Sequence, residues 1–384
     1  MCHWYYNKQP FSGGTQAMHT LILHDQAIEY RNESQQKPPR KLAETKQISA
    51  DAVLQAAKQH TATVWRGDFY QGKQLLDAIK KRIRKPAKSA DNPADAFHKY
   101  RLAQSQQSRE INMLLIEIDA HFVLNLPRAP DVQAALLDVY GEYNSERFLL
   151  PFNQLLGFIG AHEWHKKGVV IAALNDAKIH VPFGVFSPLR GEYLDLILQA
   201  KLPENCQLAF DIGTGSGILA ILLAQRGVCK ILATDNNPRA VQCAHANVAR
   251  LGFDLQIDVL QQDYFPSGLA NLIVCNPPWL PAKPTSAIET ALYDPNHTML
   301  KHILAESGNF LAENGELWLI MSDLAEHLGL RDSGSLQTWF AQFGWKIAAQ
   351  WETAPRHSKA IGQHDALSFA RQKERTYLFC LQKI

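Results

Sequence analysis

The chain lacks the features of a membrane, disulfide-bonded or strongly charged protein. None of its apolar runs reaches the roughly 18 to 20 residues that a helix needs to cross a bilayer, and no apolar signal core follows the N-terminus. The 6 cysteines include no Cys-x-x-Cys pair, so we expect buried thiols in a reducing compartment and no metal site. The net charge of +2 neither requires nor excludes a nucleic acid. These absences favour a cytoplasmic protein and leave its oligomeric state open.

Length and composition predict more than one domain. The 384 residues are 46% hydrophobic and 20% charged, which is ordinary for a globular protein of about two domains. Residues 1–45 are rich in polar residues and predict a flexible N-terminal arm. Residues 46–150 predict a mostly helical accessory domain for substrate recognition, and a pattern of alternating strands and helices fills residues 151–384.

A basic cluster lies in the predicted accessory domain. Apolar residues at 75, 76, 79 and 83 have helical spacing, and cations are dense over residues 80–88. These cations either form a solvated helix end that complements the helix dipole or contact phosphates. A second long helix is predicted over residues 96–119. The residues of the cluster that we consider for substrate binding are Lys80, Lys81, Arg82 and Arg84.

The C-terminal region has the pattern of an α/β fold. Residues 168–172 and 178–181 predict a β-hairpin lead-in within about 165–185. Strands and helices then alternate, which indicates a mostly parallel sheet with helices on both faces. The last two strands, 346–352 and 376–381, have no clear helix between them and should pair antiparallel at one edge. The other expected strands are 207–210, 230–234, 255–260, 271–275 and 316–321, and the expected helices are 217–225, 238–251 and 298–311.

A glycine-rich loop follows the first strand of this pattern. It reads Asp211-Ile-Gly213-Thr214-Gly215-Ser-Gly217 and leads into a helix. Glycine lets a backbone approach a ligand closely, and open α/β sheets bind ligands at the carboxyl ends of their strands. The loop therefore predicts a ligand site there, although a tight turn without a ligand would show the same glycines.

Two acidic residues follow the next two strands. Asp235 lies about 20 residues beyond the loop, where an acid can accept hydrogen bonds from ribose hydroxyls. As an alternative, Asp235 caps the helix that Pro238 begins. Asp263 can accept from an adenine amino group or can cap a loop. We assign Asn236 and Tyr264, their chain neighbours, to the same ligand site.

The glycine spacing favours S-adenosylmethionine over a dinucleotide. The dinucleotide fingerprint places its third glycine where this chain has Ile218. Asp211 would repel a pyrophosphate, whereas a carboxylate can help to hold the cationic methionine amino group. We therefore expect S-adenosylmethionine as the cofactor.

The motif Asn276-Pro277-Pro278-Trp279 directly follows an apolar strand. The two prolines fix the backbone and remove two N–H donors. The side-chain oxygen of Asn276 and the carbonyl of Pro277 can accept both hydrogens of an NH₂ group, which aims its nitrogen at a methyl donor. Trp279 offers a flat face for stacking. Because the sulfonium is a good electrophile, orientation is the main requirement.

With these motifs, residues from about 165 to 384 resemble the small-domain methyltransferases of class I. That family includes release-factor glutamine methyltransferases and ribosomal RNA guanine-N2 methyltransferases. The resemblance implies a seven-stranded Rossmann-like sheet, S-adenosylmethionine bound by Gly213, Gly215 and Asp235, and an acceptor nitrogen oriented by Asn276. Residues 184–187 resemble the lead-in of the guanine enzymes, and 188–192 more loosely that of the glutamine enzymes. Phe186 belongs to this lead-in and is a candidate substrate contact.

The acceptor is left open by the sequence. Trp279 stands where the glutamine enzymes usually have Tyr and the guanine enzymes often have Phe. The preferred acceptor is an exocyclic amine of guanine or adenine in RNA, and the resemblance to the guanine enzymes implies ribosomal RNA. The alternatives are a glutamine amide on a protein of translation, and a degenerate methyltransferase kept as a binding module. Tyr293 either touches substrate or, with Asp294 and Pro295, forms a simple turn.

Overall fold

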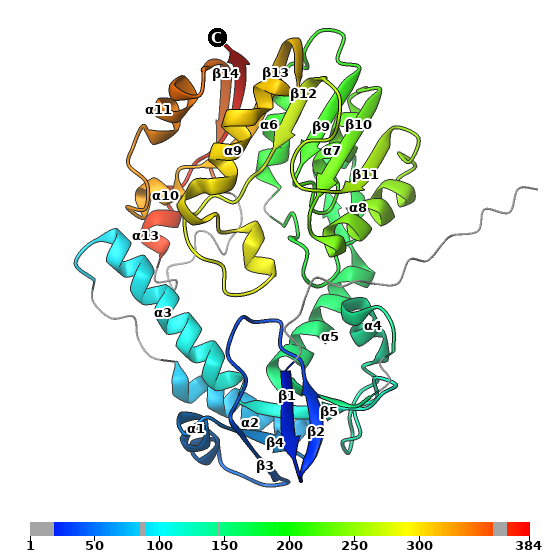
Figure 1. Ribbon diagram of the computed structural model, residues 1–384, viewed down its shortest axis with the longest axis vertical. Coiled ribbons are helices and arrows are strands. Elements are labelled where there is room, and N and C mark those ends of the chain that lie inside the picture. The colour runs from blue at the N-terminus through cyan, green and yellow to red at the C-terminus, as the bar shows by residue number, and fades with distance from the viewer. Residues whose placement is uncertain (1–18, 85–89, 144–145, 190, 356–366) are drawn as a thin grey trace, which may run out of the picture. The chain divides into compact units, whose positions relative to one another are not determined.

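Two compact units make up the protein, as a computed structural model shows (Figure 1). The first unit combines the chain up to Ile83 with residues 109–163, and the second combines 84–108 with 164–384. Within the part of the chain that the structure describes, no helix is long and apolar enough to cross a membrane. The structure describes residues 19–84, 90–143, 146–189, 191–355 and 367–384.

A six-stranded mixed sheet forms the core of the first unit. Its order is β1-β2-β6-β5-β4-β3. The pairs β1–β2 and β5–β6 are antiparallel, and the other pairs are parallel. Strand β5 reads LLIEI and is almost wholly buried, as expected for a strand covered on both faces. The strands are β1 (His19–Leu23), β2 (Gln26–Tyr30), β3 (Lys41–Thr45), β4 (Thr61–Trp65), β5 (Leu114–Ile118) and β6 (Phe148–Pro151).

Helices of the first unit bury one apolar stripe each. Helix α1 begins after Ser49, whose side chain accepts from the Ala52 N–H at 3.2 Å. Helix α2 buries Leu75, Leu76 and Ile79, which match the helical spacing in the sequence. The helices are α1 (Ala50–Lys58), α2 (Phe69–Ile83), α4 (Gln133–Tyr140) and α5 (Phe152–Lys167), whose last residues belong to the second unit.

The N-terminal region differs from the sequence prediction. A flexible arm is predicted over residues 1–45, but β1, β2 and β3 lie within it; residues 1–18 lie outside the described part. Leu21, Leu23 and Ile28 alternate with exposed residues and are buried in the sheet. Their short period-2 pattern is hidden among Asn and Gln. The domain predicted to be mostly helical over 46–150 is accordingly a mixed α/β unit.

The helix predicted over residues 96–119 is two elements. Helix α3 (Pro93–Ile111) ends before the buried strand β5 (Leu114–Ile118). The apolar residues of β5 have a spacing that also fits a helix, because a short apolar run has no distinctive period. Most of α3, residues 93–108, clusters with the second unit, so the boundary predicted near residue 150 also differs from the structure.

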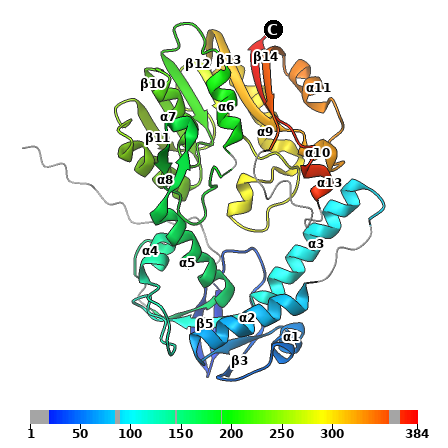
Figure 2. The ribbon, with the colours of Figure 1, turned by 180° about the vertical axis from the view of Figure 1, so that it is seen from behind.

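A seven-stranded sheet forms the core of the second unit (Figure 2). Its order is β11-β10-β9-β12-β13-β15-β14; β15 is antiparallel to both of its neighbours, and the other pairs are parallel. This confirms the Rossmann-like sheet and the antiparallel pair at its edge. The strands are β9 (Leu208–Ile212), β10 (Lys230–Asp235), β11 (Ile257–Gln261), β12 (Ala270–Cys275), β13 (Leu311–Ser322), β14 (Trp345–Thr353) and β15 (Thr376–Lys383).

Helices cover both faces of this sheet. One apolar core contains residues of α6, α7 and α8, and another contains residues of α9 and α11. Helix α7 is apolar and buried from Ile218 to Ala224, whereas α8 is amphipathic and follows the cap residue Asn237. The helices are α6 (Glu192–Gln199), α7 (Ile218–Gln225), α8 (Pro238–Arg250), α9 (Thr298–Glu306), α10 (Leu324–His327), α11 (Ser335–Gln342) and α13 (Ser368–Arg371), with short 3₁₀ turns η1 (Ala172–Leu174), η2 (Ile288–Ala291), η3 (Pro295–His297) and η4 (Ser307–Asn309).

A small hairpin precedes the sheet. Strands β7 (Val169–Ile171) and β8 (Ala177–Ile179) pair antiparallel, in the region where the sequence predicts a lead-in hairpin. Asn175 and Asp176 between them have φ of 55° and 63°, a conformation that these two residue types tolerate.

Four of the described cysteines are buried, but Cys229 is exposed. Burial raises the pKa of the Cys243 thiol to about 12 and that of Cys206 to about 11. These thiols therefore stay protonated and pack as small apolar groups.

Candidate active site

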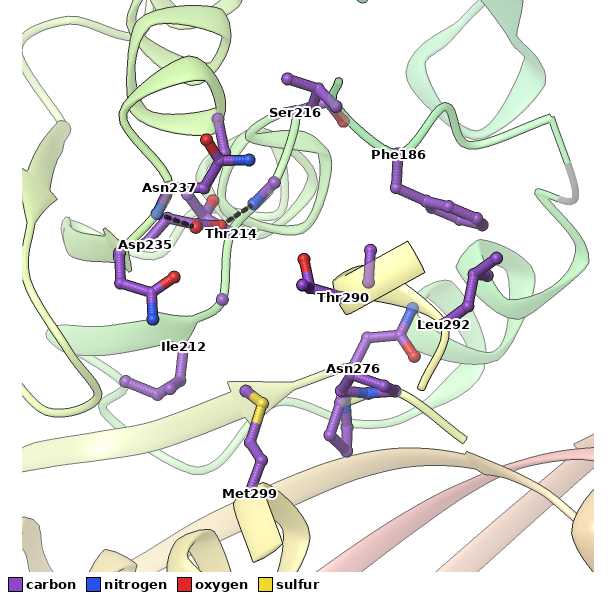
Figure 3. Close-up of a pocket in the computed structure, with 18 of the residues that line it drawn as sticks. Phe186, Ile212, Thr214, Ser216, Asp235, Asn237, Asn276, Thr290, Leu292 and Met299 are labelled. Carbon is purple, nitrogen blue, oxygen red and sulfur yellow. Dashed lines mark hydrogen bonds between the residues drawn. The ribbon is translucent and has the colours of Figure 1, made fainter. Parts of the chain in front are cut away.

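Three parallel strands bring the motifs of the sequence to one edge of the sheet. Strand β9 pairs with both β10 and β12, so their carboxyl ends are neighbours. The loops that follow these strands line a cavity of about 500 Å³ (Figure 3). The residues of the cavity wall that the sequence predicts are Phe186, Gly213, Thr214, Gly215, Asp235, Asn236, Asp263, Tyr264, Asn276, Pro277, Pro278, Trp279 and Tyr293.

The glycine loop is tied to the next strand by its backbone. The N–H groups of Gly213 and Thr214 both donate to the Thr234 carbonyl at 2.9 Å. Gly215 has a φ of +57°, and a Cβ there would meet nothing within 4 Å, so its backbone is open to the cavity. Gly217 has a φ of +83° and lies against the backbone of Ala244; it is the N-cap residue of α7. The structure places Gly217 outside the described cavity wall.

Asp211 lies beneath the loop and, in the described structure, is not part of the cavity wall. It is fully buried and accepts from the Thr214 hydroxyl at 2.6 Å and from the Ala220 N–H at 3.1 Å. Its Oδ1 has no hydrogen-bond partner among the described residues. Burial raises the pKa of Asp211 to about 7 despite these hydrogen bonds. The predicted direct contact of Asp211 with a bound ligand therefore has no support in this geometry. The hydrogen bonds that Asp211 accepts instead hold the loop in place.

Asp235 ends β10 and faces the cavity (Figure 3). Its Oδ2 accepts from the Gly215 N–H and its Oδ1 from the Asn237 N–H, each at 2.9 Å. The cap of α8 is Asn237, whose side chain accepts from the Arg239 N–H at 3.0 Å, so Asp235 does not take the capping role. Burial raises the pKa of Asp235. The carboxylate still has lone-pair capacity for a ligand hydroxyl.

Asp263 is held at the same edge of the cavity. The side-chain amide of Asn236 donates to Asp263 Oδ1 at 2.8 Å. Tyr264 has a φ of 55°, and its ring centroid lies 4.1 Å from that of His302. The hydrogen bond fixes the loop after β11 against the loop after β10, and the ring contact fixes it against α9. Two carboxylates, Asp235 and Asp263, therefore share one wall.

The Asn-Pro-Pro-Trp motif forms the opposite side of the cavity. Strand β12 ends at Cys275, and Asn276 follows it into the wall. The indole N–H of Trp279 donates to Asn276 Oδ1 at 3.0 Å. Trp279 also packs against both apolar cores of the unit. The motif is therefore anchored at Trp279, and the amide of Asn276 is oriented from within the motif.

The lead-in covers the end of the cavity near Asp235. The Gly184 carbonyl accepts from the side-chain amide of Asn237 at 3.4 Å, and the Arg239 guanidinium lies 5.9 Å from the centre of the Phe183 ring. Phe186 belongs to the cavity wall and is 38% exposed. A loop distant in sequence thus closes one end of the site.

Comparison with known proteins agrees with this geometry. A family model described as methyltransferase small domain matches residues 176–345. A putative protein N5-glutamine methyltransferase of Methanocaldococcus jannaschii is 31% identical over 163 residues, which cover 40% of this chain and 81% of that protein. The chain belongs to the methyltransferase small domain family. The family resemblance seen in the sequence is thereby confirmed.

Other members of the methyltransferase small domain family match shorter stretches. The release factor glutamine methyltransferase of Escherichia coli (strain K12) is 35% identical over 137 residues, 31% of this chain and 48% of that protein. The tRNA1(Val) (adenine(37)-N6)-methyltransferase of Bacteroides fragilis is 30% identical over 159 residues, 37% of this chain and 67% of that protein. The chain spans about half the length of the first of these curated relatives.

A further stretch of the cavity wall could not be predicted from the sequence. It comes from the loop after Trp279, where Thr290 and Leu292 face the cavity (Figure 3). Tyr293, next to them in the chain, also lines the cavity. Arg371 and Met299 add to the same wall. Only Tyr293 carried a signal in the sequence. Asp294 has a structural role, as in the alternative of a simple turn: its carboxylate accepts from two N–H groups at the start of α9, each at 3.0 Å.

The structure describes only part of the basic cluster at residues 80–88. Lys80, Lys81 and Arg82 form the last turn of α2 in the first unit, and residues 85–89 lie outside the described part. Arg82 Nε lies 2.8 Å from Asp51 Oδ1, which fits a solvated, paired helix end. Arg84, by contrast, clusters with the second unit. A role of these cations in substrate binding stays a prediction.

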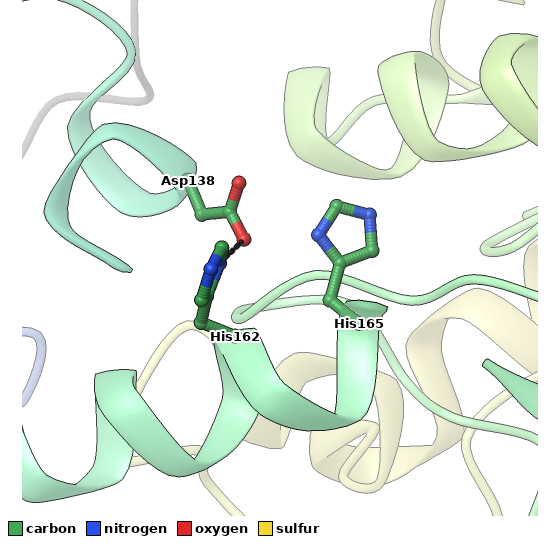
Figure 4. Close-up of side chains that lie close together, drawn as sticks. All are labelled: Asp138, His162 and His165. Carbon is green, nitrogen blue, oxygen red and sulfur yellow. Dashed lines mark hydrogen bonds and ion pairs between the residues drawn. The ribbon is translucent and has the colours of Figure 1, made fainter. Parts of the chain in front are cut away.

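A histidine of the first unit has a partner that the sequence did not indicate. His162 on α5 has its Nδ1 2.6 Å from Asp138 Oδ2 on α4 (Figure 4). His165 follows one turn later on the same helix. The contact joins two helices that are neighbours in the chain only through β6, so spacing alone could not reveal it.

Proposed function

We propose that this protein transfers a methyl group from S-adenosylmethionine to a planar nitrogen. The observation that carries the proposal is the shared cavity. One wall holds the glycine loop with Asp235 and Asp263, and the other holds Asn276 with the Pro277 carbonyl. A methyl donor and an acceptor nitrogen can therefore meet in one cavity, which is what transfer by orientation requires.

The residues of the first wall fit S-adenosylmethionine. Gly215 leaves room for a ligand against its backbone, and Asp235 and Asp263 offer carboxylates to hydroxyl and amino groups. Among the described wall residues the only Arg or Lys is Arg371, so the glycine loop has no cation to neutralise a pyrophosphate. This donor set suits a cofactor that is itself cationic better than a dinucleotide. When bound, that cofactor supplies an electrophilic methyl group.

The Asn-Pro-Pro motif orients the acceptor. The Asn276 side-chain oxygen and the Pro277 carbonyl accept the two hydrogens of a planar NH₂ group, which leaves its nitrogen lone pair directed across the cavity. Pro278 has no N–H and cannot compete for these acceptors. A strong base is not required, since the nitrogen can release its proton to water after the transfer.

The preferred acceptor is an exocyclic amine of guanine or adenine in RNA. A relative named as a tRNA adenine-N6 methyltransferase matches over 67% of its length, and aromatic residues Phe186, Trp279 and Tyr293 in the cavity wall suit a flat base. The basic cluster of α2 is consistent with nucleic acid binding. Such a substrate in the translation apparatus would place the protein in the cytoplasm.

A glutamine amide on a protein of translation is the second candidate. Relatives named as glutamine methyltransferases include the M. jannaschii protein, of which this chain covers 81%. An amide NH₂ offers the same two hydrogens to Asn276 and Pro277 as a base amine does. The geometry at the motif serves both acceptors, so the nature of the labelled product has to distinguish them.

The decisive experiment uses labelled cofactor. Full-length protein and its Asn276→Ala variant are incubated with radiolabelled S-adenosylmethionine and a fractionated extract of cells lacking the protein. Label in RNA supports the first candidate, and nucleoside analysis identifies the base; label in a protein band supports the second. The variant should bind S-adenosylhomocysteine normally and transfer no label. Cofactor binding without label in any fraction would reject the transfer reaction and favour a binding module.

A further inference from the structure

A closed loop, residues 280–294, follows the Asn-Pro-Pro-Trp motif. Its ends meet, because Leu280 and Tyr293 form a parallel β-bridge and the Asp294 N–H donates to the Leu280 carbonyl at 2.9 Å. One side of this loop belongs to the cavity wall, through Thr290, Leu292 and Tyr293 among others. The position of the loop therefore decides the shape of the space beside Asn276.

Glu289 organises the interior of the loop. It lies in the turn η2, next to Thr290, but does not belong to the described cavity wall. Its Oε2 accepts from the Thr285 N–H at 2.7 Å and from the Thr285 hydroxyl at 2.8 Å. Burial acts to raise the pKa of Glu289, but the hydrogen bonds from Arg101 and Thr285 outweigh it and hold that pKa below its usual value. The carboxylate is thus ionised at neutral pH.

Arg101 on α3 fastens the loop at three points. Its guanidinium donates to both carboxylate oxygens of Glu289, at 2.9 and 3.2 Å, and to the Lys283 carbonyl at 2.7 Å. It also lies 4.1 Å from the centre of the Tyr293 ring. The Arg101 side chain is 16% exposed. A bidentate, largely shielded contact is stronger than an exposed ion pair, and its planar fork could not be reproduced by lysine.

The helix that carries Arg101 is itself firmly seated. Phe97, one turn earlier, is 1% exposed and packs with Leu324 and Leu328 in an apolar cluster. Tyr100 and Tyr293 pack at the edge of the same cluster. Residues 97, 100 and 101 lie on one face of α3. Arg101 therefore projects from a fixed base, and its contacts transmit that fixed position to the loop.

We propose that Arg101 is a positioning residue for acceptor recognition: it holds the 280–294 loop so that Leu292 and Tyr293 form a fixed wall beside Asn276. This inference rests on the proposed function, because the wall matters only if an acceptor enters there. Arg101 does not belong to the described cavity wall and acts through the loop. Its loss should weaken acceptor binding and leave the cofactor side, formed by Gly215 and Asp235, unchanged.

The test compares four full-length proteins: the unchanged chain, Arg101→Met, Arg101→Lys, and Arg109→Met as the matched control. Arg109 is an exposed arginine on the same helix. Three quantities are measured on each: hydrogen exchange of backbone amides within residues 283–293, the Kd for S-adenosylhomocysteine, and the KM and kcat with the extract fraction that accepts label.

For Arg101→Met we expect exchange in the loop at least about tenfold faster, the loss expected when a largely shielded set of hydrogen bonds between charged groups is removed. The KM for the acceptor should rise by a similar factor, with kcat changed less. Arg101→Lys should lie between, and Arg109→Met should match the unchanged protein. The Kd for S-adenosylhomocysteine should stay within about twofold in all four proteins, because none of the substitutions changes a residue on the cofactor side of the cavity.

Unchanged exchange and unchanged KM in Arg101→Met would overturn the proposal. Loss of cofactor affinity together with activity would also overturn it, because that pattern indicates a general structural role. If the unchanged protein itself transfers no label, the proposed function fails. Faster loop exchange in Arg101→Met would then still establish that Arg101 holds the 280–294 loop, but a role of Arg101 in acceptor recognition would be rejected.

Discussion

The indole N–H of Trp279 donates a 3.0 Å hydrogen bond to the side-chain oxygen of Asn276. This contact determines which way the Asn276 amide faces. The oxygen has two lone pairs, so one remains available to an acceptor NH₂ group after the indole has taken the other. The fourth residue of the motif thus does more than offer a flat face: it orients Asn276, the residue that we propose orients the acceptor.

Replacing Trp279 should separate these two roles. Trp279→Phe keeps a flat ring and removes the N–H, so we expect kcat/KM to fall about three- to tenfold, as for the loss of one hydrogen bond. Trp279→Leu removes both features and should reduce kcat/KM further. Methyl-transfer kinetics check this, with S-adenosylhomocysteine binding as the control. Equal activity of Trp279→Phe and the unchanged protein would show that the hydrogen bond has no role.

The buried Asp211 should make stability depend on pH. Burial raises its pKa from 3.8 to about 7 in the folded protein. The folded state therefore holds a proton that the unfolded state releases above about pH 4, and stability is lost as pH rises from there through 7. Asp211→Asn has no such proton. Its Tm relative to the unchanged protein should rise between pH 4 and pH 8.

Thermal unfolding of both proteins across this pH range measures the effect. Other titrating groups are common to both proteins and cancel in the difference. The substitution also alters the hydrogen bonds to Thr214 and Ala220, which shifts the difference by a constant amount. A Tm difference that is independent of pH would show that Asp211 keeps an ordinary pKa in the folded protein.

Two glycines of the loop should respond differently to alanine. Both have positive φ, which strains any other residue. At Gly217 an added Cβ would also lie 3.2 Å from the Ala244 Cα, whereas at Gly215 it would meet nothing. We expect Gly217→Ala to lower Tm by several degrees more than Gly215→Ala, at roughly 2–4 °C per kcal/mol. Gly215→Ala should instead weaken cofactor binding, as titration calorimetry would show; the reverse order would contradict the assigned roles.

Asp235 should be needed for cofactor binding. Asp235→Ala removes the acceptor of the Gly215 and Asn237 N–H groups and the carboxylate offered to ligand hydroxyls. Hydrogen bonds to a charged group correspond to a loss of about ten- to a hundredfold in affinity. The control is Asp258→Ala on the neighbouring strand β11, where Asp258 pairs with Lys230 outside the cavity. An unchanged Kd for S-adenosylhomocysteine in Asp235→Ala would reject the assignment.

The cofactor side of the site could be predicted from the sequence because its determinants are local. Each candidate residue stands within a few positions of the end of a strand, and parallel neighbours bring those ends together. The strand preceding Gly213 and the one preceding Asn276 are short, mostly apolar runs with clear bounds. The loop after Trp279, which supplies the rest of the acceptor side, could not be predicted in this way. Glu289 gains its role only from Arg101, 188 residues away in the chain.

Most strands of the N-terminal sheet escaped prediction for a different reason. Its strands are short, and β5 (Leu114–Ile118) follows a helix so closely that the two read as one helical segment. Strands β1 and β2 alternate correctly but lie beside stretches rich in Asn and Gln. The polar composition of this region resembles that of a flexible tail. It therefore gave no indication of strands whose burial depends on partners elsewhere in the chain.

Helix α3 makes the second unit discontinuous in the chain, and this affects how the protein can be divided. A fragment that begins near residue 164 would lack Phe97 and expose the apolar surface of Leu324, Leu328 and Leu367. It would carry every motif by which the family is recognised and still lack Arg101. Fragment complementation, in which a peptide of residues 90–111 is added to such a piece, would restore the support of the 280–294 loop from two chains. The boundaries of the recognised family domain and of the physical folding unit are therefore different in this protein.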